Sequence, residues 1–207
     1  MRHLIDIETW NRKEPFAFFS TFDEPFFGIT VTIECTTAYA KAKQKGQSFF
    51  LYYLYRALEA ANRIENFRYR IVDKQVYLYD HIHASPTINR PNGTFGFAYM
   101  NYQKDENTFI QHAQEEIRKT QESTELLPAT TGENVIHFSA IPWLNFTSLA
   151  HARSFSFPDS APKISFGKVT ENQGVLRMPV SIHAHHALVD GFHVGLFVEE
   201  FQKQLNR

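Results

Sequence analysis

The stretch VLRMPVSIHAHHALVDGFHVGLFVEEFQ, residues 175–202, passes from one periodicity to another. Its first part alternates apolar and polar side chains, which is the pattern of a strand with one face against a core. After Gly191 the apolar side chains recur at helical spacing, which predicts a helix. The apolar strand positions are Leu176, Met178, Val180, Ile182 and Ala184, and the apolar helix positions are Val194, Phe197, Val198, Phe201 and Leu205.

The rest of the chain repeats these two patterns in a mixed order. Two β-rich runs flank Asp73-Lys74, which predicts a hairpin, and Ser48 is a suitable N-cap for a long apolar helix. Because helices and strands are interspersed without strict alternation, we expect an α/β fold: an α+β two-layer sandwich whose mixed β-sheet is covered by helices, in one domain over residues 1–207. Expected strands cover 29–33, the hairpin 67–80, 82–88, 93–100, 134–140, 162–169 and 174–186, with a turn at 171–174; expected helices cover 36–46, 48–64, 107–122 and the residues after 191.

Composition excludes several classes of protein. The hydrophobic fraction is 43% and includes 20 Phe, which is enough for a sizeable core, and the net charge of −1 gives no basic surface for nucleic acid. Cys35 is the only cysteine, so an intramolecular disulfide is impossible and a reducing cytoplasm fits best. No apolar run approaches the roughly 20 residues that a membrane span needs.

Four of the ten histidines lie within residues 183–193. His186 continues the apolar register of the strand, so we expect it near the interior, where burial disfavours the charged imidazolium and leaves a neutral ring able to act as a general base. His183 and His185 fall on the opposite, more polar face and are expected at the surface. Asp190 precedes a glycine, where it can steer the turn, cap the next helix or hold a cation.

Two other interpretations of these histidines remain open. His186 can be a hydrogen-bonded core residue without catalytic work. A metal site is the second, because His81 and His83, like His183 and His185, place two imidazoles on one strand face. Neither pair has an evident third ligand nearby in sequence, so we expect no metal.

The segment HHALVDGFHVG, residues 185–195, resembles the HHxxxDG signature of the chloramphenicol acetyltransferases. Further segments that are similar to blocks of this family follow in the right order, so the resemblance covers essentially the whole chain. They are IDIETWNRKEPF (5–16), ENFRYRI (65–71), GTFGF (93–97), SAIPWLNFTSL (139–149), PKISFGKV (162–169) and RMPVSIHAHH (177–186). The resemblance implies the fold of CoA-dependent acyltransferases.

The resemblance also implies an activity, namely transfer of acetyl from acetyl-CoA directly to chloramphenicol or a similar small hydroxylated acceptor, with antibiotic resistance as the associated role. His186 would be the general base, and Ser139 would donate a hydrogen bond to the oxyanion. Ser165 matches a family threonine that helps to hold water near the intermediate. Asp190 and Arg12 match a buried pair that holds the base in place.

Less specific matches concern binding of the two substrates. Trp143 and Lys168 resemble positions that line the CoA channel, and Phe19, Phe27 and Phe95 fall where the family builds its acceptor pocket. The family forms trimers with active sites between subunits, so a homotrimer is expected, without metal. The chain departs from the family pattern at single positions: Pro15 replaces a frequent His, Ser48 replaces a basic residue that often helps to hold CoA, and Val189 replaces a Cys. Two segments near the acceptor, EPFFG (24–28) and LAHARSFSFPD (149–159), also differ from the family's usual sequence.

The competing functions belong to neighbouring and to distant classes. The catalytic core of a dihydrolipoyl acyltransferase also carries HxxxDG, but it usually reads DHR where this chain has HHA. An acetyltransferase of another small alcohol would keep the catalytic residues and change the acceptor pocket. A non-catalytic, metal-binding module would use His81, His83, His183 and His185.

Overall fold

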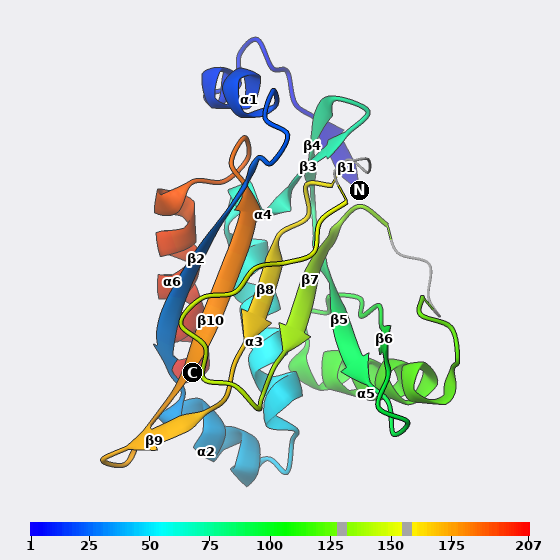
Figure 1. The fold of residues 1–207 in the computed structure, drawn as a ribbon, viewed down its shortest axis with the longest axis vertical. Coiled ribbons are helices and arrows are strands. Elements are labelled where there is room, and N and C mark those ends of the chain that lie inside the picture. Colours follow the sequence, from blue (N-terminus) through cyan, green and yellow to red (C-terminus); the bar gives the residue numbers. More distant parts are fainter. Residues whose placement is uncertain (128–131, 155–158) are drawn as a thin grey trace.

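In the main sheet, the predicted C-terminal strand, β10 (Val175–His185), lies between β2 (Phe26–Glu34) and β8 (Lys163–Phe166) (Figure 1). The computed structural model describes residues 1–127, 132–154 and 159–207. Strand order is β2-β10-β8-β7-β5-β6, with β9 paired to β10; β7 runs parallel to β5 and β8, and the other pairs are antiparallel. The sheet is therefore mixed, as expected. The strands are β2 (Phe26–Glu34), β5 (His83–Asn89), β6 (Phe95–Phe97), β7 (Val135–Ala140), β8 (Lys163–Phe166), β9 (Thr170–Asn172) and β10 (Val175–His185).

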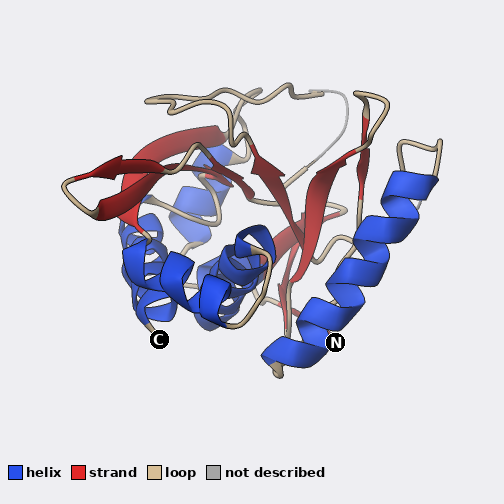
Figure 2. Cartoon of the chain, turned by 90° about the horizontal axis from the view of Figure 1, so that it is seen from below, coloured by secondary structure: helices blue, strands red, loops and turns tan. Residues whose placement is uncertain are grey.

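Helices cover one face of this sheet, and loops cover the other (Figure 2). The helical face carries the apolar register of β10, where Val180, Ile182 and Ala184 are fully buried in the core cluster that also includes apolar side chains of the helices. The second layer is therefore helical, which confirms the two-layer architecture. The helices are α1 (Lys13–Phe19), α2 (Thr36–Gln44), α3 (Phe49–Arg63), α4 (Glu65–Arg68), α5 (Glu106–Glu122) and α6 (Gly191–Asn206). None of the helices in the described ranges is long and apolar enough to cross a membrane.

The predicted hairpin forms, but it belongs to a second, smaller sheet. β3 (Tyr69–Val72) and β4 (Gln75–Tyr79) pair around Asp73 and Lys74, whose φ angles of 49° and 62° fit a type I′ turn. β1 (Arg2–Leu4) adds to β4, which gives the order β1-β4-β3. The alternating pattern of the two runs predicts the hairpin, but it does not predict which other strand the hairpin pairs with.

Three local expectations need correction. Ser48 precedes α3 as predicted, yet its side chain makes no capping hydrogen bond. Residues 171–172, expected in a turn, belong to β9, because Gln173 and Gly174 alone make the reversal with φ angles of 51° and 77°. His183 and His185 are not surface groups: His183 is half-buried and His185 is 6% exposed.

His183 and His185 are buried because segment 141–154 crosses β8 and β10 on the face opposite the helices (Figure 1). Leu144 O accepts a hydrogen bond from Lys168 N at 2.8 Å, and the His151 ring lies against the His183 ring with centroids 4.7 Å apart. Both faces of β10 are therefore covered, and polarity of one face did not mean exposure.

Candidate active site

His186 is the first residue after β10, and aromatic rings hold its imidazole. The ring stacks on Phe19 with centroids 3.9 Å apart and an angle of 4°, and Phe27 lies at 4.5 Å. His186 N donates to Pro25 O at 2.8 Å, so the backbone is fixed beside the ring. Nδ1 is buried without a hydrogen-bond partner among the described residues. Phe19 and Phe27 therefore meet His186, as two of the three expected pocket aromatics.

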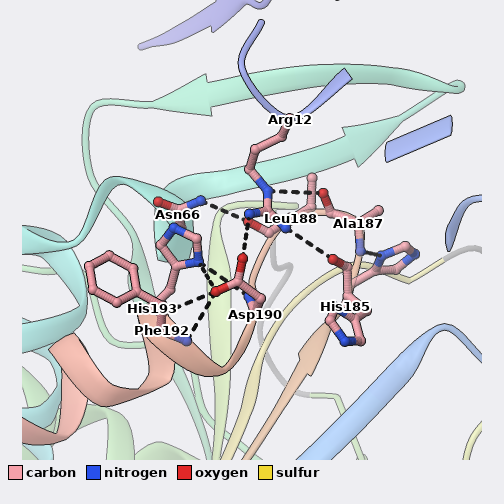
Figure 3. Close-up of polar contacts among 9 residues, drawn as sticks. Arg12, Asn66, His185, Ala187, Leu188, Asp190, Phe192 and His193 are labelled. Atoms are coloured by element: carbon pink, nitrogen blue, oxygen red, sulfur yellow. Dashed lines mark hydrogen bonds and ion pairs between the residues drawn. The ribbon is translucent and has the colours of Figure 1, made fainter. Parts of the chain in front are cut away.

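Arg12 joins the turn after β10 to the start of α1 (Figure 3). Its guanidinium donates to Asp190 Oδ2 at 2.8 Å, to His186 O at 3.1 Å and to Ala187 O at 3.3 Å. Arg12 is 7% exposed, so most of this contact is out of water. The expected pair between Arg12 and Asp190 is present, and the same guanidinium also fixes the carbonyl of His186.

Asp190 has a second partner set, because it caps α6. Its Oδ1 accepts from the backbone of Phe192 at 3.0 Å and of His193 at 3.4 Å, while Asp190 N donates to His193 Nδ1 at 3.2 Å. Burial opposes ionisation, but the hydrogen bond from Arg12 and the charge of His193 outweigh it, so the pKa of Asp190 lies below its usual range. Capping and pairing, alternatives in the sequence, therefore coexist.

Ser139 lies in a row of hydroxyls that crosses the sheet on its loop-covered face. It is directly opposite Ser165 of β8, which is opposite Ser181 of β10, and its Oγ is 3.4 Å from Thr87 Oγ1 of β5. Ser165 Oγ is buried and lacks a hydrogen-bond partner among the described residues, so it has bonding capacity for a small polar group. Ser139 and Ser165 are thus brought together.

The chain does not bring this row to its own His186. Ser181 is in register with Ser139 across two strand spacings, about 10 Å, and His186 lies five residues beyond Ser181, about 16 Å along the strand direction. Phe95 accompanies Ser139 rather than His186. The predicted site residues therefore form two groups, one around His186 and one around Ser139.

Two cavities meet at the Ser139 group. The first, of about 480 Å³, is lined by Ser139, Thr87 and Phe95 among others. The second, of about 380 Å³, shares Thr87 and is lined by residues that adjoin two predicted CoA contacts, Trp143 and Lys168. Trp143 is 64% exposed, so it is not a core residue, and Lys168 is also exposed. The lining residues next to these two are Pro142, Gly167 and Val169.

Sequence reasoning missed three side chains that line the first cavity, His137, His151 and Lys163. Burial, with Lys163 nearby, lowers the pKa of His137 to about 4, and burial, with His183 nearby, lowers that of His151 to about 4. Burial also lowers the pKa of Lys163, against the opposing charge of Asp159. His137 was within reach of the sequence, because it precedes Ser139 by two residues and so shares its strand face. His151 lies in a loop without periodicity, and its segment, 149–159, stood out only as a departure from the family sequence near the acceptor.

The proposed metal-binding pairs do not converge. His83 is on β5 and His183 on β10, and β7 and β8 separate these strands, which corresponds to about 14 Å. His83 Nδ1 accepts from Tyr102 N at 2.9 Å. Across residues 1–127, 132–154 and 159–207, no group of at least three His, Cys, Asp or Glu side chains is arranged to hold a metal ion.

Comparison with known proteins places the chain in a family. The model of the chloramphenicol acetyltransferase family matches residues 2–202. A chloramphenicol acetyltransferase of Proteus mirabilis is 30% identical over 97% of this chain and 93% of its own length, and chloramphenicol acetyltransferase 3 of Escherichia coli is 28% identical over 98% and 96%.

Solved structures agree with that placement. A chloramphenicol acetyltransferase structure matches with a TM-score of 0.92 and 38% identity over 99% of this chain and 100% of its own. The dihydrolipoamide acetyltransferase of Azotobacter vinelandii matches with a TM-score of 0.66 over 88% and 82%, but at 14% identity this likeness concerns the fold alone. By sequence over nearly its whole length and by structure, the chain belongs to the chloramphenicol acetyltransferase family.

Proposed function

We propose that the chain is an acetyl-CoA-dependent O-acetyltransferase acting on chloramphenicol or a similar small hydroxylated acceptor. The observation that carries this proposal is the family match over residues 2–202, with relatives of the same name aligned over nearly their whole length. Two cavities that share Thr87, one of them also lined by Ser139, give it physical support, because a direct transfer needs both substrates at one point.

His186 acts as the general base in this proposal. Its ring takes the proton from the acceptor hydroxyl as that oxygen attacks the thioester carbonyl. The Ser139 hydroxyl donates a hydrogen bond to the oxyanion that forms, and removing such a donor typically costs about 10²–10³ in rate. The C–S bond then breaks, and the proton returns from His186 to the leaving thiolate. The acetyl group never becomes attached to the protein.

The site is completed between subunits. Because His186 and Ser139 belong to groups far apart in one chain, we propose that His186 of one subunit meets Ser139 of the next. A homotrimer closes three such contacts by cyclic symmetry.

The remaining site residues bind substrate or hold the base. Trp143 packs on CoA and Lys168 attracts its phosphates, at the rim of the 380 Å³ cavity. Aromatic side chains of the His186 group and of the Ser139 group contact the acceptor, and Ser165 holds water near the intermediate. Arg12 and Asp190 position His186 through its backbone. The aromatic contacts are Phe19, Phe27 and Phe95.

The location and role follow from the reaction. We assign the enzyme to the cytoplasm, where acetyl-CoA is available and a buried free cysteine such as Cys35 is stable. Acetylation of chloramphenicol would give antibiotic resistance. No metal takes part in the proposed mechanism.

The proposal is tested by following thiol release from acetyl-CoA with chloramphenicol, with dihydrolipoamide and with other small alcohols as acceptors. Chloramphenicol-dependent release is expected, and His186→Ala and Ser139→Ala should each lower kcat at least a hundredfold. An unchanged rate in His186→Ala overturns the assignment. Transfer to dihydrolipoamide alone would favour the related acyltransferase class.

The subunit arrangement has its own test. His186→Ala and Ser139→Ala are unfolded together and refolded as a mixture, so that hybrid oligomers form. Sites that combine the intact His186 of one subunit with the intact Ser139 of another should restore activity in about a quarter of the sites at equal mixing. A mixture as inactive as its components would refute the shared site.

A further inference from the structure

We propose that the acceptor carries a second hydrogen-bonding group, about 7 Å from the hydroxyl that is acetylated, and that His137 and His151 recognise this group. The inference rests on the proposed function, since it takes the 480 Å³ cavity beside Ser139 as the acceptor site. It adds the class of acceptor, namely an apolar body with a polar, non-cationic end.

The sheet register fixes the spacing of the two groups. His137, Lys163 and His183 are directly opposite one another on β7, β8 and β10. This row lies two residues from the row of Ser139, on the same face of the sheet, and two residues of a strand span about 7 Å. A molecule whose hydroxyl reaches Ser139 therefore places its far end beside the imidazoles.

His151 closes this end of the cavity from above, because it comes from segment 141–154 rather than from the sheet. Its ring stands at 88° to the His183 ring, and its Nε2 is buried without a hydrogen-bond partner among the described residues. A buried polar atom without a partner destabilises the folded protein. A polar group on the bound acceptor would remove that cost, which favours such an acceptor over an apolar one.

The protonation of these rings decides what they recognise. With pKa values of about 4, His137 and His151 are neutral near pH 7, so each ring offers one N–H donor and one acceptor nitrogen. That combination suits a hydroxyl, a carbonyl or a carboxylate. The charged groups that act on the rings of His137, His151 and His183 are three cations, Arg70, Arg153 and Lys163, and two anions, Asp159 and Glu24. This excess of positive charge disfavours binding of a cationic group.

The rest of the cavity is apolar, so the acceptor is not polar throughout. Aromatic and aliphatic side chains also line the cavity, and burying apolar surface of the acceptor against them favours binding. These side chains are Phe95, Phe97, Leu127 and Ala152.

Four alcohols with one six-carbon chain test the inference: hexan-1-ol, hexane-1,6-diol, 6-hydroxyhexanoate and 6-aminohexan-1-ol. The wild-type enzyme should acetylate the diol and the hydroxy acid with kcat/KM about tenfold above hexan-1-ol, the size of one hydrogen bond, and should disfavour the amine. His151→Leu and His137→Phe should bring these ratios close to one. His81→Leu is the matched control, because His81 is exposed and outside the cavity, and it should keep the wild-type ratios.

Ratios in His151→Leu and His137→Phe that equal those of the wild type would overturn the inference, while acetyl transfer itself would still support the proposed function. A binding measurement keeps the two apart if no transfer occurs. In NMR spectra recorded without acetyl-CoA, hexane-1,6-diol should shift the ring signals of His137 and His151, and hexan-1-ol should not. Equal shifts from both alcohols, or none from either, would contradict recognition by these rings.

Discussion

Arg12 donates hydrogen bonds to three acceptors at the turn after β10. Its Nη1 donates to the carboxylate of Asp190, and its Nη2 and Nε donate to the carbonyls of His186 and Ala187. A lysine has a single ammonium and does not reach three acceptors in that arrangement. The residue that places the proposed base is therefore 174 positions away from it in sequence, and it acts on the backbone rather than on the ring.

Replacement of Arg12 separates positioning from stability. Arg12→Lys keeps the charge opposite Asp190 but loses the carbonyl contacts, so we expect kcat to fall about tenfold or more with a small change in KM, and the free energy of unfolding to fall by about 1–3 kcal/mol. Steady-state kinetics and urea unfolding measure the two effects. Lys13→Met is the control, because Lys13 pairs with Glu8 at the surface and should change neither. A kcat in Arg12→Lys equal to that of the wild type would show that the turn holds without this guanidinium.

At the scale of secondary structure, Arg70 connects the small sheet to the large one. It is fully buried, and among the described residues its guanidinium donates only to backbone carbonyls, two of which precede or begin β7. Burial lowers the pKa of Arg70 to about 10, so it remains charged near neutral pH. The carbonyls are those of Phe67, Tyr69, Glu133 and Val135.

Arg70→Met should therefore be among the most destabilising substitutions in the chain. It leaves four carbonyls without this donor in a dry site, and we expect a loss of about 3–5 kcal/mol in the free energy of unfolding. Urea denaturation gives the value. Arg177→Met, on the exposed side of β10, should stay within about 0.5 kcal/mol of the wild type. A similar, small effect of both substitutions would mean that other donors or water replace the guanidinium.

The secondary-structure elements also show which features of the fold the sequence predicts. Periodicity located β10, α6 and the hairpin around Asp73, because each is a local pattern of burial. It did not predict that the hairpin leaves the main sheet, since strand pairing depends on contacts distant in sequence. It also misplaced His183 and His185, because segment 141–154 covers them without any periodicity of its own. The pair of Arg12 and Asp190 came from family resemblance and is present, whereas their catalytic role stays a proposal.

At the scale of the whole molecule, the loop-covered face of the sheet is a layer of neutral imidazoles. Burial is the first cause of the lowered pKa in each, and nearby cations add to it. His137, His151 and His185 each have a pKa of about 4, and burial also lowers the pKa of His83 and His183 on this face and of His193 in α6. Each would regain a value near 6.5 in the unfolded chain.

Stability should consequently fall in mild acid, before the carboxylates titrate. Between pH 6.5 and about 4 the unfolded chain binds protons on these imidazoles that the folded chain does not, so the free energy of unfolding rises with pH in that window and is lost as pH falls. One such proton changes it by about 1.4 kcal/mol per pH unit. Urea unfolding at pH 7, 6 and 5, at one fixed protomer concentration, measures the slope. His137→Phe should reduce that slope by up to about one proton. A slope of zero would contradict the lowered pKa values of all these imidazoles, and a slope unchanged in His137→Phe would contradict that of His137.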